Sequence, residues 1–352
     1  MPTPATTFCD YRRIVGLGLN LTSAPWALMP KRVHVIRGRQ RITSDLGRTL
    51  RAPAVAIGNF DGVHCGHRAL VALASRLAHA EGGESAILTF DPHPARFFAP
   101  ALAPPMLLTL ERRLELLAEA GADAVVVEPF TSDFAALPAD RFVAEVLRKD
   151  LDARHVVVGW DFTFGAGRKG NAALLGSEGA RLNIGVSVVP PVMVEGLVCS
   201  STKIREFVLE GRMEGAAMLL GRPFELTGHV VHGVERGRTL GIPTANLDPE
   251  ADLLPKSGVY AAWARRVDGG LPLRLRAAVS IGSNPTFAAE SRGASSVVTV
   301  EAHLLDFDGD LYGARLRLEF SGRVRAQRSF PSADELVAEI RRDILRTREL
   351  LA

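Results

Sequence analysis

Two histidines and several glycines follow a short apolar run near residue 55. Residues 54–67 read Ala-Val-Ala-Ile-Gly-Asn-Phe-Asp-Gly-Val-His-Cys-Gly-His. Transfer of a nucleotidyl group requires charge stabilisation on the α-phosphate and on the departing pyrophosphate. His64 and His67 at a helix N-terminus can donate hydrogen bonds to those oxygens, and Gly66 lets the backbone approach them closely. The order of strand, tight turn and helix, with Gly58 in the turn, therefore predicts a phosphate site.

Two other interpretations of this histidine pair remain open at this point. The rings can be purely structural, or they can hold zinc together with Cys65. Zinc normally takes four ligands, and this stretch offers only three. The strand-turn-helix context therefore favours the phosphate role.

Three later segments lie where a ligand crevice of such a sheet would form. They are Thr89–Pro94, Val158–Gly165 and Ser200–Arg205. The aromatic residues around Asp161 suit a flat ring ligand, and the hydroxyls and cations of the third segment suit a triphosphate at a capped helix start. Plainer explanations are a strand-end turn, a hydrophobic surface loop and an ordinary capping box.

A second glycine-rich stretch, residues 228–246, ends in Gly-Ile-Pro-Thr-Ala-Asn. Glycines allow backbone amides to face a phosphate, and the side-chain oxygens of Thr244 and Asn246 suit Mg²⁺. The stretch is not a Walker loop, because the Gly-Lys-Ser/Thr ending is absent. On composition alone, a β-hairpin with a polar tip fits equally well. The two stretches together suggest two nucleotide-using sites in one chain.

The elements that must position the first site alternate between strand and helix. Near-continuous Val and Ile runs between helices predict a parallel sheet covered on both faces. The strands are predicted at residues 55–57, 86–90, 124–127, 155–158 and 186–189, and the helices at 67–80, 110–121, 142–147, 202–210 and 213–220.

The pattern changes after a linker at residues 221–223. Short strands with turn signals predict a small antiparallel barrel, and an amphipathic helix follows at residues 332–351. The barrel strands are predicted at residues 228–231, 258–266, 274–281, 296–304 and 315–320.

Composition limits the class of protein. The 352 residues are 47% hydrophobic and 23% charged, and the net charge of +3 is too small to indicate a nucleic-acid partner. Three dispersed cysteines, Cys9, Cys65 and Cys199, argue against a disulfide framework and fit a reducing cytoplasm. No apolar run is long enough for a membrane helix. Residues 1–30 are predicted to be a disordered leader or a mis-assigned start, with Met29 as the natural first residue.

The first group of segments resembles the adenylyltransferase half of the prokaryotic bifunctional riboflavin kinase/FMN adenylyltransferase family, also called FAD synthetase. The shared motifs are Gly-Asn-Phe-Asp-Gly-Val-His-x-Gly-His, Thr-Phe-Asp-Pro-His-Pro and Ser-Ser-Thr-x-Ile-Arg, in this order. The resemblance implies that His64 and His67 contact ATP phosphates. Cys65 and Arg68 stand where the family more often has arginine and glutamine, and neither change removes a phosphate-contacting group.

The second stretch resembles the riboflavin kinase signature of the same family. The similarity continues through residues 255–260, 281–287, 300–307 and 311–313. It implies that Thr244 and Asn246 bind Mg-ATP and that Glu301 is the general base for a primary alcohol, which is a poor nucleophile by itself. Without the resemblance, Glu301 reads as an ordinary surface carboxylate. Gln327 stands where the family commonly has glutamate, which brings a local ion pair into question.

The resemblance implies an α/β nucleotidyltransferase-type (Rossmann-like) domain over residues 31–221. A riboflavin kinase barrel with a C-terminal helix would follow over residues 222–352. The expected substrates are riboflavin, FMN and ATP with Mg²⁺, and FMN and FAD are product ligands. The expected site residues are Glu301, His64 and His67 for catalysis; Gly58, Asn59, Gly66, Ser201, Thr202, Arg205, Gly233, Arg236, Gly237, Gly241 and Thr244 for ATP; Asp161, Phe162 and Asn284 for flavin; and Thr244 and Asn246 for the metal.

Two rival hypotheses keep these folds. In one, the chain is a flavin-binding regulator in which one or both sites are silent. In the other, the first domain transfers a nucleotide to a different phosphorylated substrate, and the barrel only binds a ligand. Detection of FMN and FAD made from riboflavin excludes the first rival, and substrate profiling separates the second.

Overall fold

The structure is a computed structural model that describes residues 33–233, 242–268, 274–283 and 298–352. The chain divides into two compact units, Met1–Pro104 with Leu108–Ser200, and Pro105–Leu107 with Ser201–Ala352. The interpretation of residues 1–30 as a leader lies outside the described residues. The same holds for four of the expected site residues, Arg236, Gly237, Gly241 and Asn284.

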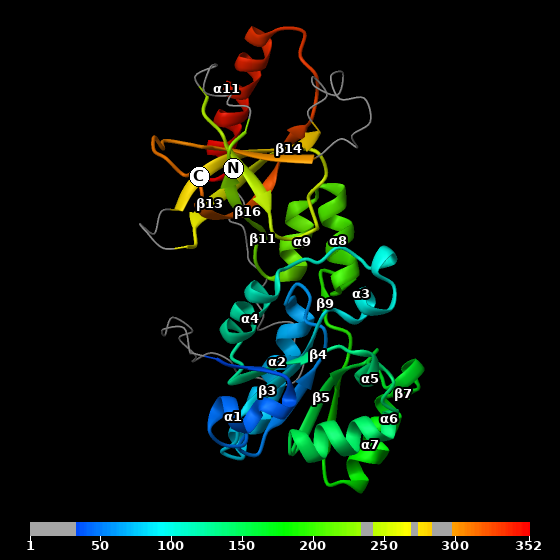
Figure 1. Ribbon diagram of the computed structural model, residues 1–352. Helices are drawn as coiled ribbons and strands as arrows, with labels where there is room; N and C mark the ends of the chain where they lie inside the picture. The colour runs from blue at the N-terminus through cyan, green and yellow to red at the C-terminus, as the bar shows by residue number, and fades with distance from the viewer. Residues whose placement is uncertain (1–32, 234–241, 269–273, 284–297) are drawn as a thin grey trace. The chain divides into compact units, whose positions relative to one another are not determined.

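Six parallel strands form the sheet of the first unit in the order β1-β4-β3-β2-β5-β8. Figure 1 labels β3, β4 and β5 of this sheet. All four residues of β2 are buried, which is typical of a strand covered on both faces. From β2 the chain proceeds outward to β3 and β4, and β5 and β8 lie on the other side. The carboxyl ends of β2 and β5 therefore border the switch point where such sheets bind ligands. The strands are β1 (His34–Arg37), β2 (Ala54–Ile57), β3 (Ser85–Asp91), β4 (Ala124–Pro129), β5 (His155–Gly159) and β8 (Gly185–Val189).

Helices cover both faces of this sheet. One hydrophobic cluster joins Val55, Leu88 and Val156 of the strands to Phe142 and Val146 of η4. Alternate strand residues face the other side, where α2 contacts β2, β3 and β5, and α4 contacts β4. The helices are η2 (Arg39–Arg41), α1 (Ile42–Leu46), α2 (Cys65–Ala80), α3 (Pro94–Phe98), η3 (Pro100–Leu102), α4 (Leu110–Glu119), α5 (Ser132–Ala135), α6 (Ala139–Arg141), the π-helix η4 (Phe142–Asp150), η5 (Ala166–Arg168) and α7 (Ala172–Arg181). Two small hairpins complete the unit, β6 (Thr163–Phe164) with β7 (Gly170–Asn171), and β9 (Met193–Val194) with β10 (Leu197–Val198).

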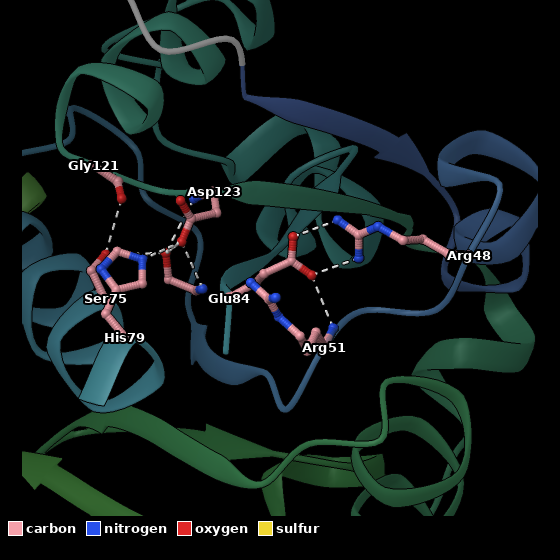
Figure 2. A network of polar contacts seen from close by, with 8 residues as sticks. Arg48, Arg51, Ser75, His79, Glu84, Gly121 and Asp123 are labelled. Carbon is pink, nitrogen blue, oxygen red and sulfur yellow. Dashed lines mark hydrogen bonds and ion pairs between the residues drawn. The ribbon is translucent and has the colours of Figure 1, made fainter. Parts of the chain in front are cut away.

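A polar network closes the amino ends of β3 and β4 (Figure 2). Asp123 Oδ2 accepts hydrogen bonds from the backbone N–H of Ser85 at 3.0 Å and from its hydroxyl at 2.9 Å. The same oxygen lies 2.6 Å from His79 Nε2. Next to it, Glu84 pairs with both terminal nitrogens of Arg48 at 2.7 and 2.6 Å. These groups satisfy one another's hydrogen-bonding capacity, so we assign this network a role in stabilising the fold.

The second unit holds a closed antiparallel barrel in the order β11-β12-β15-β14-β13-β16. Its interior is apolar, with Tyr260, Ala302, Leu318 and Phe320 fully buried. Alternate residues face outward, and α11 contacts the outer sides of β13, β14 and β16 (Figure 1). The elements are α8 (Ser201–Glu210), α9 (Met213–Leu220), β11 (Phe224–Val231), β12 (Ala245–Pro249), β13 (Gly258–Arg266), β14 (Arg274–Ser283), β15 (Val298–Leu304), β16 (Arg315–Ala326) and α11 (Ala333–Leu350).

Ion pairs fasten α11 to the barrel on both sides of Gln327. Arg325 pairs with Asp343 at 2.8 Å and Arg328 with Glu339 at 2.7 Å. Gln327 itself lies against Gly282 of β14, where an added Cβ would overlap its side chain. The charges next to Gln327 therefore come from the neighbouring arginines.

The predicted parallel sheet, antiparallel barrel and C-terminal helix are confirmed. The sequence did not predict β1 or β12, and the structure lengthens the last barrel strand to Ala326. The expected domain boundary at residue 221 stays a prediction, while α8 and α9 belong to the second compact unit. Within the described ranges, no helix is both long and apolar enough to cross a membrane.

Candidate active sites

The connection between β2 and α2 carries most of the first expected site. His64 caps α2, and its Nδ1 accepts a hydrogen bond from the backbone N–H of His67 at 3.3 Å. The two imidazole rings stack with centroids 3.6 Å apart and planes 18° apart. A Cβ at Gly66 would stand 3.1 Å from the His64 ring, so glycine at this position keeps the backbone close to the histidine.

The two histidines have a defined chemical state. Because Nδ1 of His64 accepts a backbone N–H, the neutral ring carries its proton on Nε2. Burial, then the neighbouring His64, then the charge of Arg113 hold the pKa of the His67 ring well below its usual 6.5. At neutral pH His67 is therefore an uncharged hydrogen-bonding group and not an imidazolium. The Cys199 sulfur also lies 3.5 Å from His64 Nδ1.

Arg113 of α4 contacts this turn at Asn59, although the sequence analysis assigned it no role. Its side chain is only 5% exposed, and it donates to the Asn59 carbonyl at 2.9 Å and to the Phe90 carbonyl at 3.2 Å. It therefore ties the ends of β2 and β3 together. Burial lowers the pKa of its guanidinium, and the charges of Asp61 and Asp91 oppose that shift. Arg113 stands on the buried face of α4 with Leu114 and Leu117, so its place in an apolar stripe is the signal that could have revealed it.

Unsatisfied polar atoms gather at this edge of the sheet. Among the described residues of the first unit, the buried side-chain atoms without a hydrogen-bond partner are Nδ1 of His67, Nε of Arg68 and Nε of Arg113. The amino edge of the sheet, by contrast, has the mutually satisfied network of Figure 2. Buried orphan groups in a folded protein call for a ligand or water to satisfy them, and here two belong to the first residues of α2 while Arg113 is bonded to Asn59 at the end of β2.

The other expected residues of the first site fall into two groups. Gly58 and Asn59 belong to the same connection as the histidines, and Asp161 and Phe162 follow β5, the parallel neighbour of β2. Asp161 is exposed, whereas Phe162 is half-buried and stacks on Phe164 at 5.3 Å.

The segment of α8 belongs to the second unit. Ser201, Thr202 and Arg205 lie on α8, and Arg205 Nε donates to the Pro105 carbonyl at 2.7 Å. Their contact with the same ATP as the histidines stays a prediction.

The barrel brings Asn246 and Glu301 together through strand register. Asn246 of β12 pairs directly with Glu301 of β15, and Glu301 pairs in turn with Ser280 of β14. Directly paired residues share one face with Cβ atoms about 5 Å apart. That face is the outer one, because Val300 and Ala302 on either side of Glu301 are buried in the barrel.

Two contacts on this face involve the two described ends of the glycine-rich stretch, at Gly233 and at Pro243. A Cβ at Gly233 would overlap the side-chain amide of Asn246, so glycine lets the chain pass without displacing that side chain. His303 Nδ1 lies 2.8 Å from the Pro243 carbonyl, next to Thr244. A carbonyl only accepts, so His303 donates and anchors the residue before Thr244. The sequence analysis placed His303 in the similar segment 300–307 but assigned it no role.

Glu301 has an environment that suits a base. It is half-buried, and burial raises the pKa of its carboxyl above the usual 4.5. A carboxylate with a raised pKa accepts a proton more readily at neutral pH than an exposed glutamate does.

The two sites differ in how well their side chains suit a metal ion. Within the described ranges, no group of three or more His, Cys, Asp or Glu side chains is placed to hold a metal ion, which gives the zinc interpretation of His64, Cys65 and His67 no support. Asn246 offers an amide oxygen on the strand position paired with Glu301, and Thr244, two residues earlier, offers a hydroxyl. Oxygen donors of this kind fit Mg²⁺.

Comparison with known proteins covers both units. A family model described as FAD synthetase matches residues 48–203, and one described as riboflavin kinase matches residues 220–351. The bifunctional riboflavin kinase/FMN adenylyltransferase of Escherichia coli K12 is 38% identical over 295 residues, which cover 84% of this chain and 91% of that protein. The corresponding proteins of Haemophilus influenzae and Bacillus subtilis are 33% and 31% identical, cover 89% of this chain in each case, and are themselves covered to 97% and 96%.

A solved structure is also similar across most of the chain. The crystal structure described as a macrolide-efflux protein from Streptococcus pneumoniae has a TM-score of 0.77 and 31% identity. The match covers 90% of this chain and 99% of that one. The likeness therefore extends through both units.

Proposed function

Because the chain belongs to the bifunctional riboflavin kinase/FMN adenylyltransferase family, we propose that its two activities reside in the two sites described above. The enzyme carries out two steps of flavin cofactor synthesis. It phosphorylates riboflavin to FMN with ATP, and it adenylylates FMN with ATP to give FAD and pyrophosphate. We assign the first step to the outer face of the barrel and the second to the β2–α2 connection.

In the kinase step, Glu301 takes the proton of the ribityl 5′-hydroxyl while that oxygen attacks the γ-phosphorus of ATP. The bond from the γ-phosphorus to the bridging oxygen breaks, and ADP leaves. The burial that raises the Glu301 pKa supports this role. Thr244 and Asn246 would hold Mg²⁺, which when bound neutralises phosphate charge.

In the adenylylation step, an oxygen of the FMN phosphate attacks the α-phosphorus of ATP and pyrophosphate departs. Neutral His64 and His67 donate N–H groups to phosphate oxygens, and the N-terminal amides of α2 add further donors. Asn59, Gly58 and Gly66 shape the turn, while Asp161 and Phe162 border the flavin. Neither step needs a covalent enzyme intermediate, because positioning and charge organise both displacements.

Reduced, buried Cys65 and Cys199 support a reducing compartment, and we place the enzyme in the cytoplasm. Riboflavin, FMN and ATP are its small-molecule partners, and we propose no nucleic-acid or membrane partner.

The observation that carries the assignment is the pairing of Asn246 with Glu301 in one unit and the stacked histidines at the α2 N-terminus in the other. The test incubates the purified full chain with riboflavin, ATP and Mg²⁺ and resolves the flavins by chromatography. Wild type makes FMN and then FAD. Glu301→Ala makes neither from riboflavin yet converts supplied FMN, and the His64→Ala/His67→Ala double variant stops at FMN.

Two matched controls guard against general damage. His79→Ala removes another histidine of α2 at its far end, and Glu319→Gln alters a half-buried carboxylate on β16. Both should retain both activities. If the double histidine variant still makes FAD, the first assignment is wrong; if Glu301→Ala still makes FMN, the second is wrong.

A further inference from the structure

The segment that follows β10 carries a thiol that contacts His64. Cys199 Sγ lies 3.5 Å from His64 Nδ1, and the two residues are only 8% and 6% exposed. The backbone N–H of Cys199 donates to the Val192 carbonyl at 2.8 Å. Its carbonyl lies 3.6 Å from the point where a Cβ at Gly66 would stand. The backbone of Cys199 is therefore held in place, and its thiol is held beside the histidine.

The direction of this contact follows from a hydrogen bond that His64 accepts. Nδ1 of His64 accepts the backbone N–H of His67, so that nitrogen carries no proton. The Cys199 sulfur could accept only from a proton on Nδ1, and that proton would point at the His67 N–H. Cys199 is therefore a thiol whose S–H donates to Nδ1.

The stack with His67 fixes the plane of the His64 ring but not its orientation within that plane. A half-turn about the Cβ–Cγ bond keeps the plane, and it exchanges Nδ1 with Cδ2 and Nε2 with Cε1. The hydrogen bond from His67 is long, at 3.3 Å against a usual value of about 2.9–3.0 Å, so by itself it favours one orientation only weakly. The Cys199 S–H is a second donor that favours the same orientation.

This orientation of His64 places a proton where adenylylation uses one. With Nδ1 as the acceptor, the neutral ring carries its proton on Nε2. After a half-turn, a C–H would take the place of the Nε2–H, and the ring would donate no hydrogen bond to a phosphate oxygen there. Negative charge on the phosphate oxygens changes most as the bond to the departing pyrophosphate breaks, so the loss would fall mainly on the transition state.

We propose that Cys199 is a positioning residue for FMN adenylylation. Its S–H holds the His64 ring in the orientation and tautomer that present Nε2–H to a phosphate oxygen. In this role the thiol contacts no substrate and forms no covalent bond. The inference rests on the assignment of FMN adenylylation to the β2–α2 connection.

Substitutions at Cys199 test this role in the full chain supplied with FMN and ATP. Cys199→Ala removes the donor, so kcat for FAD formation should fall by about twofold to tenfold, the range for one lost neutral hydrogen bond, while KM for ATP changes less. Cys199→Val also lacks a donor but fills the space, and it should lose as much. Cys199→Ser keeps a donor and should recover part of the loss. The matched control Val194→Ala shortens another buried side chain next to this segment, on β9, and should leave kcat unchanged.

Nitrogen NMR of the same proteins, made with isotope-labelled histidine, separates positioning from packing. The His64→Asn variant identifies the signals of the His64 ring. Wild type and Val194→Ala should show one protonated and one unprotonated ring nitrogen. In Cys199→Ala and Cys199→Val the two signals should move toward each other, because the two tautomers interconvert once the thiol donor is lost.

Kinase turnover of the same samples reports whether the chain is intact. Unchanged kcat and unchanged ring signals in Cys199→Ala and Cys199→Val overturn the role of Cys199. A lower kcat with unchanged ring signals also overturns it, as do equal losses of kcat in Cys199→Ala and Val194→Ala, because packing would then explain the effect. An active His64→Ala/His67→Ala variant instead overturns the site assignment on which the inference rests.

Discussion

The two units assemble their sites by different means. In the first unit, one continuous stretch from Gly58 to His67, which leaves β2 and enters α2, holds both histidines and the glycines, and the sheet only has to place that stretch at its carboxyl edge. In the barrel, Asn246 and Glu301 are distant in sequence and meet because β12 and β15 pair in one register. The first site therefore depends on local geometry, and the second depends on correct long-range pairing.

The units also differ in the hydrogen-bonding and protonation state of their expected site residues in the absence of substrate. The α2 end keeps buried side-chain nitrogens of His67, Arg68 and Arg113 without a hydrogen-bond partner. The barrel site instead holds the carboxylate of Glu301, whose pKa is raised by burial. One site is prepared to receive anions, and the other is prepared to receive a proton.

The sharpest way to break the barrel site while sparing the other is Gly233→Ala. The added Cβ would overlap the Asn246 amide and displace that expected metal ligand. We expect kinase activity to fall by about a hundredfold, the cost of a misplacement near 1 Å, with FMN adenylylation unchanged. Separate rate assays with riboflavin and with FMN check this. Gly176→Ala, with open space around its Cβ, is the control. Equal kinase rates in the two variants would contradict the crowding argument.

The first unit is best challenged through Arg113→Met. The substitution leaves the Asn59 and Phe90 carbonyls without their donor, so we expect a loss of about 2–3 kcal/mol in its unfolding free energy. The urea midpoint for loss of adenylylation, normalised to each variant's activity without urea, measures this, and kinase midpoints should not move. Arg112→Met, which breaks the ion pairs with Glu115 and Glu119, should cost about 1 kcal/mol or less. Similar midpoints for both variants would argue against the buried role of Arg113.

A pH series separates the proton-accepting site from the anion-receiving one. A base works only when ionised, and burial raises the Glu301 pKa above 4.5. Below that raised pKa, kinase turnover should fall about tenfold per pH unit, because the ionised fraction of the Glu301 carboxyl falls about tenfold per unit. Rates measured at saturating riboflavin and ATP show this limb. Adenylylation by the same samples lacks the limb, and an acid limb shared by both reactions would point to unfolding instead.

The smallest expected effect concerns stability of the first unit in mild acid. The unfolded His67 binds a proton near pH 6.5, while the folded ring, with its lowered pKa, does not. Stability should therefore be unaffected above that pH and decrease below it by up to about 1.4 kcal/mol per pH unit, until the folded pKa is reached. Urea midpoints of adenylylation activity on both sides of pH 6.5 measure the slope. His67→Asn should flatten it, whereas His79→Asn on the same helix should keep it.

Much of the fold followed from the sequence because its signals are local. Continuous Val and Ile runs predicted the parallel strands, and the paired histidines predicted the α2 turn. The sequence analysis missed β12 because Ala245–Pro249 is a short run that ends in proline and has one buried residue, and its strand conformation comes from pairing with β11 and β15. The sequence analysis missed Arg113 because a charged residue within an apolar helix pattern is usually predicted to be exposed to solvent. Glu301 was identified only through family resemblance, since barrel register cannot be read from residue spacing.

Closure of the barrel also affects how readily each of the two units aggregates on heating. Its six strands each have partners on both sides, whereas the parallel sheet ends in β1 and β8, where Val35 and Val188 are more than one-third exposed. Open strand edges with apolar side chains are templates for intermolecular pairing. On heating, we therefore expect aggregation to begin from the first unit, so that capacity to make FAD disappears irreversibly while FMN formation persists.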